Sequence, residues 1–131
     1  MPFDGTTIRK RRLPKRDPSG AQSALVLGMT AFFFQDGALW TRQHWKTRAG
    51  ARCLVEAVRF VRHEIGSRDD RALDYLAQAI RETYRDCRGV WGSCDLVVRY
   101  NDAKGRTYSE IDHVLRRAKH LAEADAWQAM A

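Results

Sequence analysis

A mainly helical fold with a small β-element, in the α+β class, is what the sequence predicts. Apolar residues recur at helical spacing in four separate segments, which indicates about four amphipathic helices. Two short stretches, around 40–47 and 95–100, are rich in strand-forming residues and indicate a small hairpin or sheet. A length of 131 residues with 44% hydrophobic content fits one globular domain. We expect that domain over residues 19–131, after a basic arm over residues 1–18.

The arm over residues 1–18 is expected to be flexible. It holds all three prolines and few apolar side chains, so it cannot bury enough surface to offset the entropy lost on ordering. Six Lys or Arg against two acidic residues place +4 of the net charge of +7 in residues 1–20, which leaves +3 for the rest of the chain. The basic residues are Arg9, Lys10, Arg11, Arg12, Lys15 and Arg16.

Three hypotheses account for this basic cluster. Its side chains can neutralise phosphates, which gives nucleic-acid affinity without sequence choice and with a steep salt dependence. The cluster also resembles a nuclear-import signal, which would matter only in a eukaryotic host. The third hypothesis is a solubilising terminus without a partner. Charges of both signs are mixed along the predicted helices, so we assign any nucleic-acid contact mainly to the arm.

The first helix is predicted from about residue 20 to residue 35. Ser19 and Gln22 have the spacing of a capping box, and Gly37 is expected to end the helix. The densest apolar run, residues 24–34, is 11 residues long, whereas crossing a bilayer takes about 20. We therefore expect a core helix and no membrane span. Its core-facing stripe is predicted to be Leu25, Met29 and Phe32, widened by Val26 and Phe33.

A short hairpin is predicted between Leu39 and Arg52. The segment contains Trp and Thr residues that favour strands, and Ala49-Gly50 offers a turn. Residues 95–100 are predicted to form a further short strand, with alternate residues on opposite sides, which pairs with the hairpin.

Two more helices are predicted over about residues 52–65 and 69–86. In the first, apolar residues repeat at helical spacing, and Gly66 suits the left-handed residue just past a helix end. In the second, Ser67 with Asp70 resembles an N-terminal cap. Its apolar stripe is Leu73, Leu76, Ala77, Ile80 and Tyr84.

The last helix has the clearest pattern. Thr107 and Glu110 form a capping box that opens it, after the turn residues 101–105. Its apolar face is predicted to be Ile111, Val114, Leu115, Ala118, Leu121 and Ala122.

Cys53 is the candidate nucleophile, because a helix N-terminus stabilises a thiolate. A nucleophile also needs a positioned base, and cysteine is among the most often buried residue types, so a core thiol is the favoured interpretation. The histidines form no recognisable arrangement around it and are His44, His63, His113 and His120.

The cysteines favour neither a metal site nor a disulfide framework. Cys87 and Cys94 lack the paired spacing of structural zinc ligands, so no metal and no cofactor is expected. An odd number of thiols, with no secretory signal in the first twenty residues, indicates a cytoplasmic protein.

The candidate ligand positions are the turn residues Asn101, Asp102, Gly105 and Arg106. Asn and Asp bond nearby backbone and Gly tolerates positive φ, so a structural turn explains most of the segment. Arg106 needs another reason, since its guanidinium could pair with Asp102 or bind an anion near the start of the last helix.

Four aromatic side chains present a further choice. They could line a pocket or stack on bases, whereas aromatics in a small domain more often complete the core. They are Trp40, Trp45, Trp91 and Tyr100.

Three segments resemble a family of small uncharacterised bacterial and phage proteins. They are Asp36-Gly37-Ala38-Leu39-Trp40-Thr41, the helix start Cys53-Leu54-Val55-Glu56-Ala57, and Arg99-Tyr100-Asn101-Asp102-Ala103-Lys104-Gly105-Arg106-Thr107. Glu56 stands where the family tends to have Gly, and Tyr100 where it tends to have Trp. The resemblance covers about residues 20–122 and implies a shared fold without an assigned activity.

Two functional hypotheses remain. The first is a non-catalytic binding or regulatory module that contacts nucleic acid through its arm, or else a protein partner. The second is a small enzyme that uses Cys53 and the Asn101-Asp102 turn, which requires a concave site joining these residues. The burial of Cys53 and its place relative to Asn101 distinguish the two.

Overall fold

A computed structural model describes residues 20–84 and 92–130. These residues form five α-helices and one short 3-10 helix, and they contain no β-strand. None of the helices in these ranges is both long and apolar enough to cross a bilayer. The helices are α2 (Ala21–Phe33), η1 (Gln35–Gly37), α3 (Leu54–Glu64), α4 (Ala72–Thr83), α5 (Ser93–Asp102) and α6 (Tyr108–Met130).

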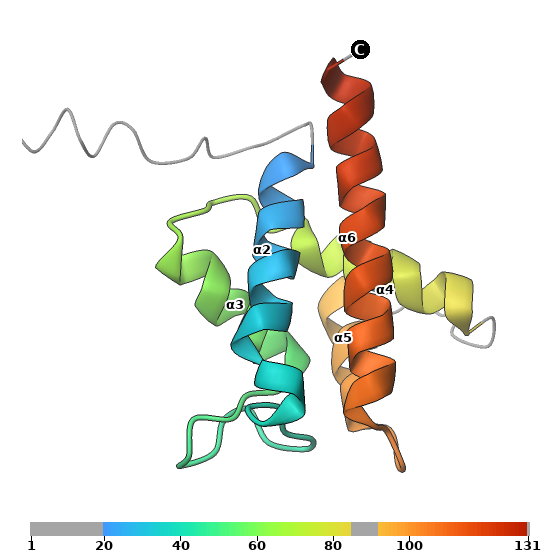
Figure 1. The fold of residues 1–131 in the computed structure, drawn as a ribbon. Coiled ribbons are helices and arrows are strands. Elements are labelled where there is room, and N and C mark those ends of the chain that lie inside the picture. Colours follow the sequence, from blue (N-terminus) through green and yellow to red (C-terminus); the bar gives the residue numbers. More distant parts are fainter. Residues whose placement is uncertain (1–19, 85–91, 131) are drawn as a thin grey trace, which may run out of the picture.

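The antiparallel helices α2 and α6 form the central pair of the fold (Figure 1). At one end of the pair, a Cβ added at Gly20 would lie only 2.6 Å from the carbonyl oxygen of Ala122 on α6. At the other end, the rings of Phe34 and Tyr108 meet edge to face with centroids 5.6 Å apart. Contacts at both ends therefore fix the register of the two helices.

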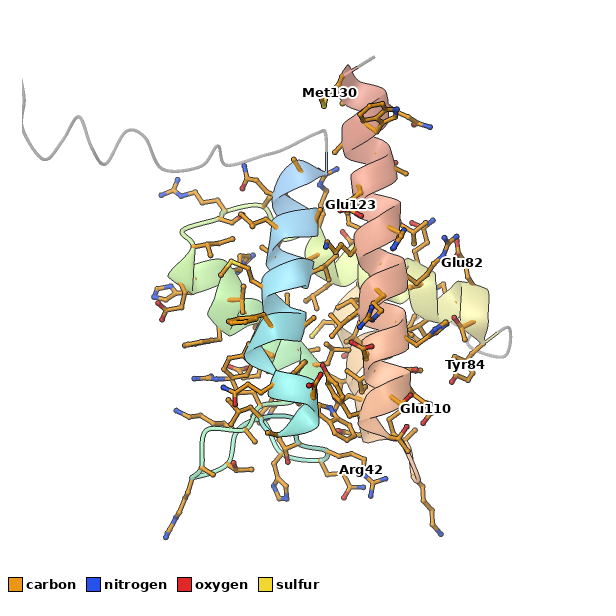
Figure 2. The ribbon with its side chains drawn as sticks, in the orientation of Figure 1. Arg42, Glu82, Tyr84, Glu110, Glu123 and Met130 are labelled. Carbon is orange, nitrogen blue, oxygen red and sulfur yellow. The ribbon has the colours of Figure 1, made fainter. Side chains whose placement is uncertain are left out.

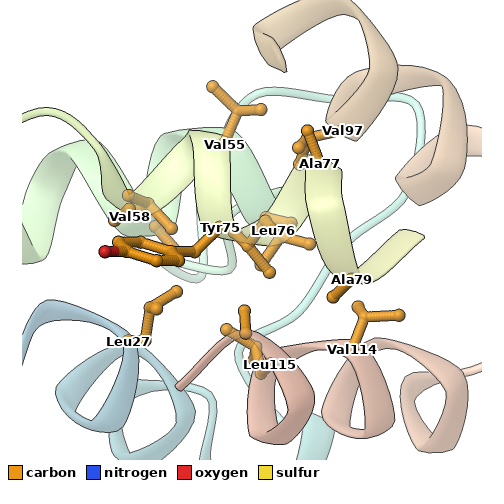
Figure 3. Packing of buried hydrophobic residues seen from close by; sticks show 14 of the residues in the cluster. Leu27, Val55, Val58, Tyr75, Leu76, Ala77, Ala79, Val97, Val114 and Leu115 are labelled. Atoms are coloured by element: carbon orange, nitrogen blue, oxygen red, sulfur yellow. The ribbon is translucent and has the colours of Figure 1, made fainter. Parts of the chain in front are cut away.

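α4 crosses behind α6 in the view of Figure 1, and the core lies between α4 and the pair of α2 and α6 (Figure 3). Leu27 of α2 and Leu115 of α6 point towards Leu76 of α4, and all three are fully or almost fully buried. Each such side chain contributes about 1.5–3 kcal/mol of transfer free energy on burial. α3 covers α2 on its other side, and α5 packs against α4 and α3.

The buried face of α2 differs from the predicted one. Leu25, Met29 and Phe32 are exposed, and Phe32 retains 82% of its accessible surface. α2 is apolar almost all round, so its periodicity does not single out one face. The contacts with α6 and α3 select the buried side instead, which consists of Gln22, Ser23, Ala24, Val26, Leu27 and Thr30.

The predicted hairpin over 39–52 is wrong. The chain there is an irregular loop with two isolated bridges, Trp40 to Arg52 and Lys46 to Arg52. Gln43 and Gly50 have φ values of 68° and 92°, which interrupt any extended strand. Irregular backbone bonds, such as Thr41 N–H to Arg52 O at 3.1 Å, and side-chain bonds from α5, described below, hold the loop in place of a hairpin ladder.

The predicted strand over 95–100 is wrong as well, because these residues lie within α5. Leu96, Val97, Tyr100 and Asn101 are its buried residues, and their spacing of one, four and five is that of a helix face. Six residues are too few to distinguish the alternation of apolar residues in a strand from their spacing in a helix. Packing against α4 and α3 overrides the β-propensity of the two valines.

Of the two predictions for the junction between α3 and α4, the one for the end of α3 is confirmed and the one for the start of α4 is wrong. Gly66 has the expected positive φ of 72°, and the bonds Gly66 N–H to His63 O (3.1 Å) and Ser67 N–H to Arg62 O (3.0 Å) close α3. Ser67 does not cap α4, which begins at Ala72. Its hydroxyl donates to Gln22 Oε1 at 2.6 Å and so ties this loop to α2. Gln22 is thus engaged across the fold, and the N-cap of α2 is Gly20, not Ser19.

We predict that Gly20→Ala lowers the free energy of unfolding by about 2–4 kcal/mol, because a side chain at φ 86° is strained and would collide with Ala122. Gly50→Ala is the matched control, since Gly50 also has a positive φ of 92° but nothing lies within 4 Å of an added Cβ. We expect it to cost about 1–2 kcal/mol in chemical denaturation. Equal losses would contradict a tight α2–α6 approach.

Candidate functional site

The buried side chain of Asn101, at the end of α5, joins three segments of the chain. Its Oδ1 accepts from the Trp40 indole Nε1–H at 2.7 Å and from the Leu54 backbone N–H at 3.1 Å. Its Nδ2 donates to the Thr41 carbonyl at 3.2 Å and to Asp102 Oδ1 at 2.9 Å. These four bonds use the full capacity of an amide side chain. Asn101 is therefore a structural residue with no bonding capacity left for a ligand.

Two further bonds hold the loop between η1 and α3 against the end of α5. Asp102 Oδ1 accepts from the Gln43 backbone N–H at 2.7 Å. The Arg42 guanidinium donates to the Ala103 carbonyl at 2.9 Å, which also satisfies an orphan acceptor near the helix end. The loop is thus an anchored platform, although it has no regular secondary structure.

A cavity of about 140 Å³ lies between this loop, the start of α3 and α5. It brings Cys53 together with Asn101 and Asp102, as the enzyme hypothesis requires. The other lining residues are Gln43, His44, Trp45 and Val98.

Cys53 at this cavity is a helix cap. Its Sγ accepts from the Glu56 backbone N–H at 3.5 Å, and only 6% of the residue is exposed. Burial raises the pKa of the thiol, and the negative charge of Asp102 adds to this effect. Among the described contacts, no hydrogen bond joins His44 to the sulfur. The thiol is therefore protonated at neutral pH and lacks a bonded base.

Arg106 belongs to a separate cluster and does not form the pair with Asp102 that was one of the two roles considered for it. Its guanidinium donates to the Tyr100 carbonyl at 2.7 Å and to Glu110 Oε2 at 3.0 Å. It also stacks on the Tyr100 ring, with Cζ 3.8 Å from the ring centroid, and lies near Tyr84. Arg106 thus joins the end of α5 to the start of α6.

The capping box predicted at the start of α6 is confirmed. Glu110 Oε1 accepts from the Thr107 backbone N–H at 2.9 Å, and Thr107 Oγ1 accepts from the Glu110 N–H at 3.4 Å. The first of these bonds lowers the pKa of Glu110, and the Arg106 charge acts in the same direction. Gly105, with φ 78°, makes the tight turn that precedes the box.

The remaining sequence-predicted candidates do not form one site. Tyr100 is buried beside Tyr84, Trp40 is bonded to Asn101, and Trp45 lines the cavity. The basic arm residues Arg9, Lys10, Arg11, Arg12, Lys15 and Arg16, together with Cys87 and Trp91, lie outside the described residues.

The sequence profile of a family of unknown function, DUF6197, matches residues 18–121. The chain belongs to DUF6197. This confirms the resemblance to a family without an assigned activity. No curated protein and no solved structure matches the chain.

The residues that suggested the resemblance to DUF6197 are largely explained by structural bonds. Trp40, Thr41 and Asn101 meet in one hydrogen-bonded set with the start of α3. Arg106 and Glu110 pair at the start of α6. These residues therefore specify the fold, and the motif alone is no evidence of catalysis.

The loop between η1 and α3 carries a basic surface that was not recognised from the sequence. Between Asp36 and Glu56 the chain has no acidic residue. Arg42 donates to Ala103, so the loop lies beside the turn that holds Lys104. In the part of the chain that the structure describes, no carboxylate forms an ion pair with Arg42, Lys46, Arg48 or Lys104. The missed signal is the one-sided charge of the loop. We call Arg42, Lys46, Arg48 and Lys104 the basic end.

We predict that Asn101→Asp lowers the free energy of unfolding by about 3–5 kcal/mol at pH 7, because a buried carboxylate would face Asp102 and the Thr41 carbonyl. The folded state raises the pKa of the new carboxyl. The loss should therefore be full where the pH exceeds the raised folded pKa, shrink as the pH falls from that value to the ordinary carboxyl pKa of about 4, and be smallest below it. Gln128→Glu, the same type of change on exposed α6, should cost less than about 0.5 kcal/mol in urea titrations.

We expect Arg106→Gln to destabilise the protein by about 2 kcal/mol, because it removes the carbonyl bond and the ring stacking of a largely buried guanidinium together with its ion pair to the partly exposed Glu110. Asp102→Asn retains an acceptor for Gln43 and should cost about 1 kcal/mol or less. Thermal melting of Arg117→Gln, which loses only the exposed pair with Glu82, is the control. Parent-like melting of Arg106→Gln would refute the structural role of Arg106.

Proposed function

We propose that this DUF6197 protein is a non-catalytic binding module that contacts nucleic acid. The observation that carries the proposal is the basic end. Lys46, Arg48 and Lys104 are exposed there, and the adjoining loop contributes no negative charge. Phosphates attract such a surface irrespective of base sequence.

The placement of the basic end supports contact with an extended polyanion. Arg42 lies at the end of the molecule opposite Met130 (Figure 2). The loop and the turn before α6 both lie at that end (Figure 1), and the bond from Arg42 to the Ala103 carbonyl joins them. Charges from two separate segments are thus combined on one surface, because the bonds of Arg42 and Asp102 hold the segments together.

The arm supplies the second part of the proposed contact. Its six basic residues lie within positions 9–16, ahead of the family match and of α2. α2 has 13 residues and is about 20 Å long, and the basic end lies at its other terminus. A nucleic acid that spans the length of α2 would be able to meet both basic regions.

We place this binding in the cytoplasm. Cys53 and Cys94 are both free thiols, which a reducing compartment maintains.

The alternative function is a thiol enzyme at the small cavity. The cavity does place Cys53 beside Asn101 and Asp102. The raised pKa of the thiol and the complete bonding of Asn101 argue against this alternative, so binding is the preferred function.

The proposal predicts that binding depends on the location of the charges. In fluorescence anisotropy, a loop variant with Lys46→Gln, Arg48→Gln and Lys104→Gln should reduce the slope of log affinity against log salt by about 2 to 3 on a DNA duplex. Replacement of the six basic arm residues by Gln should reduce it further.

The matched control is Arg116→Gln, Arg117→Gln and Lys119→Gln, which removes the same charge from α6. This control should bind within about threefold of the parent, because its charges lie outside the proposed contact. Equal losses in the control and loop variants, or no retention of the parent at low salt, would contradict the proposal.

A further inference from the structure

We infer that the cavity beside Trp45 holds one unstacked base of a single-stranded nucleic acid, an inference that rests on the proposed function. It assigns the ligand class of the cavity and a preference for single strands over duplexes. The argument uses the size of the cavity, the position of Trp45 and the polar group that Asp102 presents.

The size of the cavity suits a fragment as small as one base. Its volume of about 140 Å³ exceeds the roughly 30 Å³ share of one water molecule several times. It is well below the roughly 300–1,000 Å³ of sites for drug-sized ligands. A single planar ring is therefore a better match than a complete nucleotide cofactor.

Trp45 combines exposure with a fixed backbone. The residue is 55% exposed although it lines the cavity. Its carbonyl accepts from the Cys53 backbone N–H at 3.1 Å, and the next residue, Lys46, forms a bridge with Arg52. A large aromatic ring on an anchored loop is the usual stacking platform for an unpaired base.

Asp102 gives the cavity a hydrogen-bond acceptor. Its Oδ1 accepts from Gln43 N–H and Asn101 Nδ2, while its Oδ2 accepts no hydrogen bond among the described contacts. An ionised carboxylate accepts from the exocyclic amino group of cytosine or adenine. Thymine and uracil present a carbonyl at the corresponding position, so we expect them to bind less well.

The surrounding charge fits the phosphates on either side of that base. Lys46 directly follows Trp45, and Arg42, Arg48 and Lys104 belong to the same end of the molecule. These side chains would hold the strand through its backbone, and the cavity would hold the base. A base within a duplex is stacked and paired, so it could enter only at the additional cost of unstacking.

The test measures anisotropy of labelled oligo-dC, oligo-dT and a mixed-sequence duplex, each about 15 nucleotides long, with the full chain at low salt. Trp45→Ala should weaken oligo-dC binding about 5- to 100-fold and leave duplex binding within about twofold. Trp45→Phe, which keeps an aromatic ring, should stay within about threefold for oligo-dC. Trp127→Ala is the matched control, because Trp127 is 74% exposed near the far end of α6.

Asp102→Asn should remove the preference for oligo-dC over oligo-dT, because Asn presents a donor where the carboxylate accepted. Circular dichroism melts of every variant establish that the fold is retained. An equal effect of Trp45→Ala on single strand and duplex, or no effect on either, would overturn the inference while leaving the proposed function intact. Failure of the parent to bind any of the three probes would overturn both.

Discussion

The architecture around the loop depends on one side chain, the buried amide of Asn101. Backbone bonds such as Thr41 N–H to Arg52 O (3.1 Å) and Arg52 N–H to Leu39 O (2.8 Å) close the loop between η1 and α3 on itself, but they do not tie it to α5. The amide supplies the missing constraint, because it bonds the Trp40 indole, the Thr41 carbonyl and the first N–H of α3 at once. A fully satisfied buried network of this kind fixes one arrangement among many of similar apolar burial. The cavity and the basic end both owe their geometry to this constraint.

The two ends of the segment 101–110 have different structural roles, although the sequence groups Asn101, Asp102 and Arg106 as residues of one turn. Asn101 and Asp102 terminate α5 and bind the loop, whereas Arg106 and Glu110 join α5 to α6 through Tyr100 and Tyr84. The guanidinium lies between a carboxylate and two aromatic rings, so its charge is compensated without a ligand. The positive charge that faces solvent comes instead from residues such as Lys46 and Lys104, which stand out by no sequence motif.

Local signals in the sequence predicted part of this fold. The caps at Gly66 and Thr107 and the positions of the helices α2, α3, α4 and α6 follow from residues that are close in sequence. The buried face of α2, the helical state of residues 95–100 and the form of the loop depend on partners some 20 to 100 residues away, which no local pattern contains. In the candidate site, the enzyme hypothesis placed Cys53 beside Asn101 and Asp102, as the cavity does. The bonds of Arg106 to Glu110 and Tyr100 and the basic charge of the loop were not predicted.

α6 packs against its neighbours over only part of its length. Its buried residues are Ile111, Val114, Leu115, Ala118 and Ala122, whereas Trp127 and Met130 are largely exposed. Near the boundary, the Tyr75 hydroxyl donates to Asp125 at 2.6 Å, and burial together with this bond raises the pKa of Tyr75 to about 12. The helix therefore carries a gradient of local stability. We expect the amide hydrogens of its buried central turns, around Val114 to Ala118, to exchange only when the whole domain opens, and those beyond Asp125 to exchange through local fraying.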